Sequence, residues 1–275
     1  MTGDICTEFT RDGYVIVKDV IGPQTVLALR SFFLPMFQQG EAHVLHDAIL
    51  HYPQIFDVVS TPKLVRVLTS LLGETFVVPP YSSVEFNRFG LFHTDTTGAE
   101  ISNQTFHKET DFRIVTVAIY LQDNNEYGGG IRLAPGSHRD LDPYVELTKR
   151  KTELRRRVSQ SPLRRMLKRL SLGRVYDWNK PFQEHERGID LPTKAGDAII
   201  WDLRIAHSAS PKRAKGPAPD GGKLSIFFNC GANNSITTQA YMKYVVSIPE
   251  NEFLRRERPL PAQTGAYAKQ EFVLL

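Results

Sequence analysis

Hydrophobic positions in the first quarter of the chain predict a short strand and two helices. A β-branched run at residues 14–17 follows the turn residue Gly13 and favours a strand. After Pro23, apolar residues recur at helical spacing, at positions 26, 27, 29, 32 and 33. A second helix is predicted over 62–72, because Thr61 can cap it, Pro62 suits its first position and Gly73 suits its end.

Beyond residue 73 the pattern changes to short runs of β-branched and aromatic residues, separated by clusters of Gly, Pro, Asn and Asp. The runs lie at residues 75–90, 106–121, 129–134, 198–207 and 223–230. Runs of this length and spacing are typical of an antiparallel sandwich or barrel. The tail at 233–275 has no strong period beyond 241–248, so we expect it to pack irregularly over the core.

These elements predict one domain over residues 1–275, mainly β with flanking helices. Its parts are a helical N-terminal flank at about 1–74, a β-core at about 75–138 and 196–232, and an insert at about 139–195. The insert is long for a connection within a β-domain. Long excursions of this kind are commonly lids or binding loops, so we expect a lid-like role.

The composition is that of a globular protein. The chain has 275 residues, of which 41% are hydrophobic and 23% charged, and this excludes a disordered, collagen-like or coiled-coil chain. Its two cysteines, Cys6 and Cys230, are far apart and exclude a disulfide scaffold or a zinc ribbon. No apolar run approaches the ~18 to 20 residues of a membrane span, and the start lacks a signal-peptide pattern, so we expect a cytoplasmic protein.

The positive charge of the chain is concentrated in one segment, residues 148–174. Eleven basic residues against the single acid Glu153 give that segment a net charge of +10, which leaves −6 for the rest of a chain whose total is +4. A globally basic nucleic-acid binder is therefore not expected. The segment can attract an anionic group, such as a phosphate, a carboxylate or a carrier-linked substrate. The alternative is a solvated surface helix or an oligomer contact.

Three of the eight histidines lie where metal ligands are expected, and His43, His46, His51, His138 and His185 do not. His107 and Glu109 precede the apolar run at 114–121, and a period of two puts both side chains on one face of a strand. His207 ends another apolar run. Two histidines and one carboxylate are the ligands of the facial triad that holds non-haem Fe(II). The pair His93 and Asp95 has the same spacing and remains an alternative.

Several motifs resemble those of the phytanoyl-CoA dioxygenase family of Fe(II)- and 2-oxoglutarate-dependent oxygenases. They are the start at 9–17, the helix at 64–73, the stretches 119–123 and 128–138, and the stretch from Gly196-Asp197 to His207-Ser208. The resemblance implies a core of the double-stranded β-helix type, also called jelly-roll or cupin-like. In this family Pro135-Gly-Ser-His138 is a structural turn, so His138 is not expected to be a ligand.

The resemblance implies that His107, Glu109 and His207 bind Fe(II), although the proximal motif of the family is usually H-x-D and here reads H-x-E. A glutamate offers the same oxygen donors with one more methylene. The literal H-x-D of His93 and Asp95 stays open as the proximal pair. Because either assignment supplies a carboxylate, the halogenating branch of the family, which replaces it to make room for chloride, is disfavoured.

The family also needs a cation for the distal carboxylate of 2-oxoglutarate, usually an arginine on the strand after the distal histidine. Alternation along 223–230 puts Lys223, Ser225, Phe227 and Asn229 on one face of a strand. We expect Lys223 with Ser225 to take this role, with Arg213 as the second candidate. A lysine offers a point charge where arginine offers a bidentate fork.

The resemblance therefore implies an Fe(II)- and 2-oxoglutarate-dependent dioxygenase that consumes O2 and releases succinate and CO2. Its expected substrate is a small molecule, anionic or carrier-protein-linked, and hydroxylation is the default outcome. Neither a membrane nor a nucleic acid is an expected partner. One alternative is a non-catalytic β-helix module that uses residues 148–174 as its partner surface, and another is a cupin-type metal protein with different chemistry.

Overall fold

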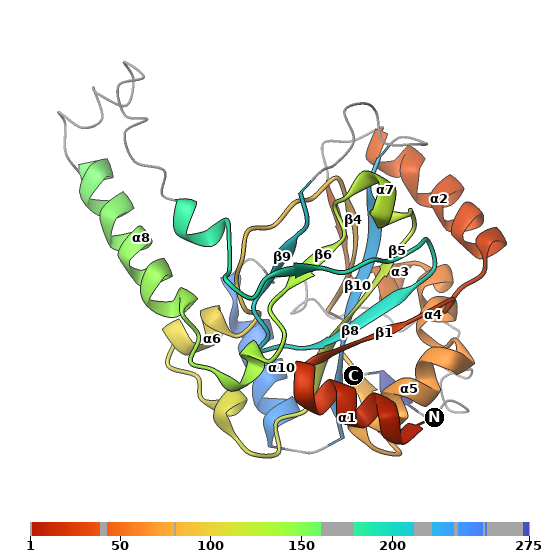
Figure 1. The fold of residues 1–275 in the computed structure, drawn as a ribbon, viewed down its shortest axis with the longest axis horizontal. Helices are drawn as coiled ribbons and strands as arrows, with labels where there is room; N and C mark the ends of the chain where they lie inside the picture. The colour runs from red at the N-terminus through yellow and green to blue at the C-terminus, as the bar shows by residue number, and fades with distance from the viewer. Residues whose placement is uncertain are drawn as a thin grey trace.

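Two β-sheets lie at the centre of the structure (Figure 1), a computed structural model that describes residues 2–38, 43–79, 81–160, 179–211, 222–233, 236–249, 251 and 272–274. The larger sheet has the order β1 (Tyr14–Val17), β8 (Ala198–Asp202), β5 (Ile114–Tyr120), β10 (Leu224–Ala232), β3 (Phe76–Val78) and β11 (Phe272–Leu274). In addition, β4 (Ser82–Phe86) pairs with β10 and with β2 (Val44–His46). The smaller sheet has the order β7 (Ile189–Asp190), β6 (Ile131–Leu133) and β9 (His207–Ala209).

Helices cover the outer face of the larger sheet and flank its ends. The α-helices are α1 (Thr2–Asp12), α2 (Pro23–Gln38), α3 (Ala48–His51), α4 (Pro53–Val59), α5 (Pro62–Leu72), α6 (Thr97–Ile101), α7 (Asn124–Tyr127), α8 (Tyr144–Gln160) and α10 (Thr237–Ser247). Short 3-10 helices span Phe106–Lys108, Ser137–Arg139 and Lys180–Phe182. Helix α8 extends away from the two sheets (Figure 1). Among the described residues, no helix is both long and apolar enough to cross a membrane.

The period of two along β5, β8 and β10 divides the core in two. Positions such as Val117, Ile200 and Ile226 face α2, α4 and α5 and form the main hydrophobic cluster with them. The neighbouring positions, among them Tyr120 and Trp201, face the smaller sheet and pack against its strand β6. The space between the two sheets is therefore lined by the second set of positions.

Strand register sets polar side chains side by side on this inner face. Thr116 of β5 lies opposite Trp201 of β8 and opposite Asn229 of β10. Four residues further along each strand, on the same face, Ser225 of β10 lies opposite Tyr120 of β5 and Glu85 of β4. These two rows form the floor on which a site between the sheets is built.

Most of the predicted elements are present. The helix predicted between Thr61 and Gly73 is α5, with those two residues as its caps and Gly73 at φ 110°, and the predicted first strand and helix are β1 and α2. The expectation for the tail is corrected, because α10 occupies residues 237–247 as a regular helix with Tyr241 and Val245 buried. The run at 106–121 is also shorter as a strand than expected, since β5 begins only at Ile114.

Candidate metal centre

Two histidines and one aspartate converge between the sheets. His93 and Asp95 lie in the segment that joins β4 to α6, and His207 is the first residue of β9. His93 and His207 pair across an antiparallel bridge, with N–H to O distances of 3.0 Å from His93 to His207 and 2.9 Å in the reverse direction. One ligand atom from each of the three side chains lies within 4.8 Å of the others. This pairing extends the smaller sheet and brings the two imidazoles together.

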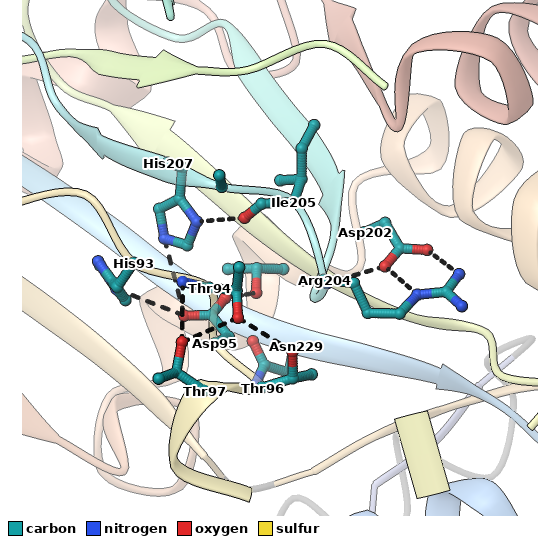
Figure 2. A network of polar contacts seen from close by, with 12 residues as sticks. His93, Thr94, Asp95, Thr96, Thr97, Asp202, Arg204, Ile205, His207 and Asn229 are labelled. Atoms are coloured by element: carbon teal, nitrogen blue, oxygen red, sulfur yellow. Dashed lines mark hydrogen bonds and ion pairs between the residues drawn. The ribbon is translucent and has the colours of Figure 1, made fainter. Parts of the chain in front are cut away.

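Both imidazoles are held so that their Nε2 atoms face the carboxylate (Figure 2). Nδ1 of His93 lies 2.7 Å from the carbonyl oxygen of Leu91, and Nδ1 of His207 lies 3.0 Å from that of Ile205. A carbonyl only accepts, so each Nδ1 carries the proton and each Nε2 keeps its lone pair. Both Nε2 atoms lie 3.7 Å from Oδ1 of Asp95. Backbone carbonyls that fix the tautomer of a histidine are a common feature of metal sites.

The carboxylate of Asp95 is oriented from its other side. Its Oδ2 accepts a hydrogen bond of 3.0 Å from Oγ1 of Thr116 on β5, which leaves Oδ1 toward the imidazoles. The backbone N–H of Asp95 donates to the carbonyl of Leu203 at 3.1 Å. Each of the three ligand side chains thus has a supporting contact, from the carbonyls of Leu91 and Ile205 and from Thr116 of the larger sheet.

Burial keeps His207 neutral. It lowers the pKa of His207 to about 4, and the neighbouring carboxylate of Asp95 only partly opposes this effect. The ring also packs on Trp201, with centroids 5.2 Å apart. At neutral pH the imidazole is therefore in the unprotonated form that binds a metal ion.

The structure places the expected proximal pair outside the group that contains His207. His107 lies in the 3-10 helix ahead of β5, where its Nε2 is 3.2 Å from Oε2 of Glu100, and Glu109 is exposed. The period-two argument fails because residues 107–109 are not part of the strand. Within the described residues, the group of potential metal ligands consists of His93, Asp95 and His207, which includes the H-x-D motif that the sequence left as an alternative.

The predicted 2-oxoglutarate residues lie on the inner face, as the alternation along 223–230 indicates. Lys223 is buried just before β10, and its Nζ donates to the carbonyl of Arg88 at 2.7 Å. Burial lowers its pKa to about 8. Ser225 is fully buried, and among the described residues its hydroxyl has no hydrogen-bond partner. Arg213 lies outside the described residues.

A cavity of about 310 Å³ joins the three ligand residues to Lys223. Thr116, Trp201, Asn229, Tyr120 and Phe227 line its inner-sheet wall. A second wall comes from Tyr81 and from Tyr241 and Tyr244 of α10. These tyrosines were not predicted as part of the site from the sequence. For Tyr241 and Tyr244, the apolar period at 241–248 was the available signal, because it indicates the helix that carries them.

The described part of α8 does not cover this cavity. None of its described residues lines the 310 Å³ space. Lys151 instead donates to Oδ1 of Asn179 at 2.8 Å and lies 4.7 Å from the ring centroid of Phe182. Residues 161–174, the second half of the expected basic segment, lie outside the described residues.

Sequence comparison identifies the class of protein. The family model of phytanoyl-CoA dioxygenase (PhyH) matches residues 9–218, and the chain therefore belongs to this family of Fe(II)- and 2-oxoglutarate-dependent oxygenases. An ectoine dioxygenase of Bordetella bronchiseptica is 22% identical over 237 residues, which cover 76% of this chain and 70% of that protein. An ectoine dioxygenase of Sphingopyxis alaskensis is 21% identical over 281 residues, which cover 90% of this chain and 80% of that protein.

Solved structures share the fold. EctD from S. alaskensis with bound Fe has a TM-score of 0.55 at 15% identity, over 84% of this chain and 77% of that one. The epimerase SnoN in complex with Fe3+, alpha ketoglutarate and nogalamycin RO has a TM-score of 0.53 at 17% identity, over 84% and 83% of the two chains. The expected β-helix core with flanking helices is thus confirmed.

Proposed function

We propose that this protein hydroxylates a small molecule in the 310 Å³ cavity, with Fe(II) bound by His93, Asp95 and His207. The observation that carries the proposal is the convergence of three ligand atoms within 4.8 Å, each on a side chain fixed by a second contact. Two imidazoles and one carboxylate are the donor set of non-haem Fe(II) oxygenases. When bound, Fe(II) together with 2-oxoglutarate and O2 supplies the oxidant, and succinate and CO2 are released.

Lys223 and Ser225 are our candidates for binding the distal carboxylate of 2-oxoglutarate. Lys223 is a buried cation on the wall of the cavity that holds the metal ligands, and a buried charge needs a counter-charge or strong acceptors. Its present acceptor is one backbone carbonyl, and the rings of Phe89 and Tyr120 lie 5.1 and 5.8 Å from its Nζ. The unpaired hydroxyl of Ser225, on the same strand face, adds a second donor.

The tyrosines that line the cavity support a small substrate with polar groups on an apolar frame. Tyr81 and Tyr244 offer hydroxyls next to aromatic surface, and Tyr241 accepts a hydrogen bond from Nδ2 of Asn229. The charges of Glu85 and Arg88 compensate each other in an ion pair of 3.0 Å. Similar proteins include ectoine dioxygenases and an epimerase in complex with nogalamycin RO, and both names support a small-molecule substrate.

The cations of α8 fit an anionic or carrier-linked substrate whose charged group lies outside the cavity. Because the described part of α8 lies outside the cavity, its exposed Arg150 and Arg155 can contact a group that extends beyond the cavity, such as the phosphate of a carrier arm. The reacting part of the substrate would then lie inside the cavity, against the tyrosines that line it. The alternative of a non-catalytic module predicts no metal ligands, and the group of His93, Asp95 and His207 argues against it.

Turnover of 2-oxoglutarate tests the proposal. We expect the wild-type protein with Fe(II), 2-oxoglutarate and O2 to form succinate, and we expect Asp95→Ala to form none. Glu109→Ala is the matched control, since this carboxylate is exposed and outside the ligand group, and it should keep wild-type turnover. Succinate formation that survives Asp95→Ala, or wild-type protein that gives neither succinate nor an iron-keto acid absorption band, would overturn the proposal.

A further inference from the structure

The carboxylate of Asp142 accepts three hydrogen bonds next to the segment 93–97, which contains two of the proposed metal ligands. Oδ2 of Asp142 accepts from Oγ1 of Thr94 at 2.7 Å and from Oγ1 of Thr97 at 2.6 Å. Oδ1 of the same side chain accepts from the backbone N–H of Tyr144 at 2.8 Å, at the start of α8. Asp142 therefore connects the segment 93–97 to a helix that begins about fifty residues later in the sequence.

The two threonines lie on either side of a proposed metal ligand. Thr94 separates His93 from Asp95, and Figure 2 shows Thr94 and Thr97 close to Asp95. The ligand side chains and Thr94 face opposite ways, because His93 and Asp95 line the 310 Å³ cavity whereas Thr94 lines a second cavity of about 390 Å³. Asp142 lines this second cavity as well. Asp142 thus holds the segment 93–97 from the side of the second cavity, away from the proposed metal site.

The hydrogen bonds at Asp142 are costly to lose. Thr94 and Thr97 are 4% and 8% exposed, so water cannot readily replace the carboxylate as their acceptor. Among the described residues, no cationic group lies within ion-pair distance of Asp142, and its charge is met by these donors. Charge-assisted hydrogen bonds of this kind are about twice as strong as neutral ones.

We infer that Asp142 is a positioning residue of the metal centre, which fixes the Thr94–Thr97 turn so that Asp95 presents Oδ1 to the two imidazoles. The inference rests on the proposed metal role of His93, Asp95 and His207. It also makes the first turn of α8 part of the support of the centre, since the same carboxylate receives the Tyr144 N–H. Asp142 acts through the threonines and does not itself touch the metal ligands.

A double-mutant cycle with Fe(II) as the probe tests this role. The variants are Asp142→Ala, the pair Thr94→Val with Thr97→Val, and all three changes together. Anaerobic calorimetric titration measures the Fe(II) affinity, and hydrogen exchange of the metal-free protein measures the opening of residues 93–97. Asp140→Ala is the matched control, because this exposed carboxylate lies two residues earlier and pairs with Arg187 instead.

We expect Asp142→Ala to weaken Fe(II) binding about tenfold, in the range for outer contacts of metal ligands, and to speed exchange at 93–97. The threonine pair should have a similar effect, and the combined variant should add little to it, because both changes remove the two threonine hydrogen bonds to Oδ2 of Asp142. Asp140→Ala should match the wild type. Additive losses, or unchanged exchange at 93–97 in Asp142→Ala, would overturn the inference.

The two proposals can fail separately. Wild-type protein that binds no Fe(II) would contradict the proposed function, and the exchange measurement on metal-free protein would still decide whether Asp142 holds the turn. If Asp142→Ala does not fold, Thr94→Val with Thr97→Val removes the two hydrogen bonds to Oδ2 of Asp142 and leaves the Tyr144 N–H bond at the start of α8 in place.

Discussion

The charge of Lys223 makes the affinity for 2-oxoglutarate depend on pH in a way that the structure predicts. Burial lowers the pKa of this ammonium to about 8, so it is mostly charged at pH 7 and mostly neutral at pH 9. Only the charged form attracts a carboxylate, hence affinity should be level below about pH 7 and fall as pH rises through 8. With a pKa of about 8, the charged fraction drops about tenfold between pH 7 and pH 9, and the affinity should drop with it.

Substitution of Lys223 gives the size of the interaction. A hydrogen bond to a charged group contributes about 1.5 to 3 kcal/mol, so Lys223→Met should weaken 2-oxoglutarate binding roughly 10- to 150-fold at pH 7. Lys223→Arg is the matched control for charge, because a guanidinium stays protonated from pH 7 to pH 9. Its affinity should therefore be independent of pH over this range, whatever its absolute value.

The assay is an anaerobic titration of Fe(II)-loaded protein with 2-oxoglutarate at pH 7, 8 and 9, followed by the visible absorption of the iron-keto acid chelate. Two results would refute the reasoning. One is a wild-type affinity that does not change between pH 7 and pH 9, and the other is a Lys223→Met variant that binds as tightly as the wild type.

Three further predictions concern the support of the site and the stability of the fold. Thr116→Val removes the donor to Oδ2 of Asp95 and should weaken Fe(II) binding about tenfold in a calorimetric titration, whereas Thr116→Ser should not; equal affinities would refute this role. Phe33 is fully buried, so Phe33→Ala should lower the free energy of unfolding by about 3–5 kcal/mol in urea titration, and a loss below ~1 kcal/mol would contradict its place in the core. Gly196 has φ +89°, and a Cβ there would lie 2.3 Å from the carbonyl oxygen of Ile21. Gly196→Ala should therefore lower the free energy of unfolding by more than about 1 kcal/mol in the same titration, and an unchanged free energy of unfolding would disprove this.

Features set by neighbouring residues were predictable from the sequence. The helix between Thr61 and Gly73 has its start and stop signals within its own ends, and α5 occupies that interval. The alternation along β10 placed Lys223 on the inner face, because a period of two is a property of the strand itself. His207 was a candidate because it ends the apolar run at 198–207, although the structure divides this run into β8 and β9 and places His207 at the start of β9.

The partner of His207 depends on contacts that the sequence does not display. His93-Thr-Asp95 and His107-Lys-Glu109 have the same spacing, and the choice depends on which segment pairs with β9. The structure pairs the first with His207 through two backbone hydrogen bonds. The second belongs to a turn that packs its histidine against Glu100. Such long-range pairing is a property of the sheet, and no local pattern reports it.

Helix α10, which lines the cavity, was also not predicted, because its position depends on contacts between residues far apart in the sequence. Its residues 237–247 show only a weak apolar period, and the helix is stabilised by contacts with distant elements. Tyr241 packs against Phe106 and receives a hydrogen bond from Asn229. The buried residues of this helix are Thr237, Thr238, Tyr241 and Val245, so it lacks the continuous aliphatic stripe by which an amphipathic helix is predicted from sequence.

The most direct test of the account is whether His93 or His107 binds the iron. Anaerobic Fe(II) titration should be carried out on the wild type, His93→Gln, His107→Gln and His207→Gln, with thermal unfolding as the check on folding. We expect one bound Fe(II) in the wild type and in His107→Gln, and strongly weakened binding in His93→Gln and His207→Gln. Loss of Fe(II) binding in His107→Gln with wild-type affinity in His93→Gln would contradict this expectation.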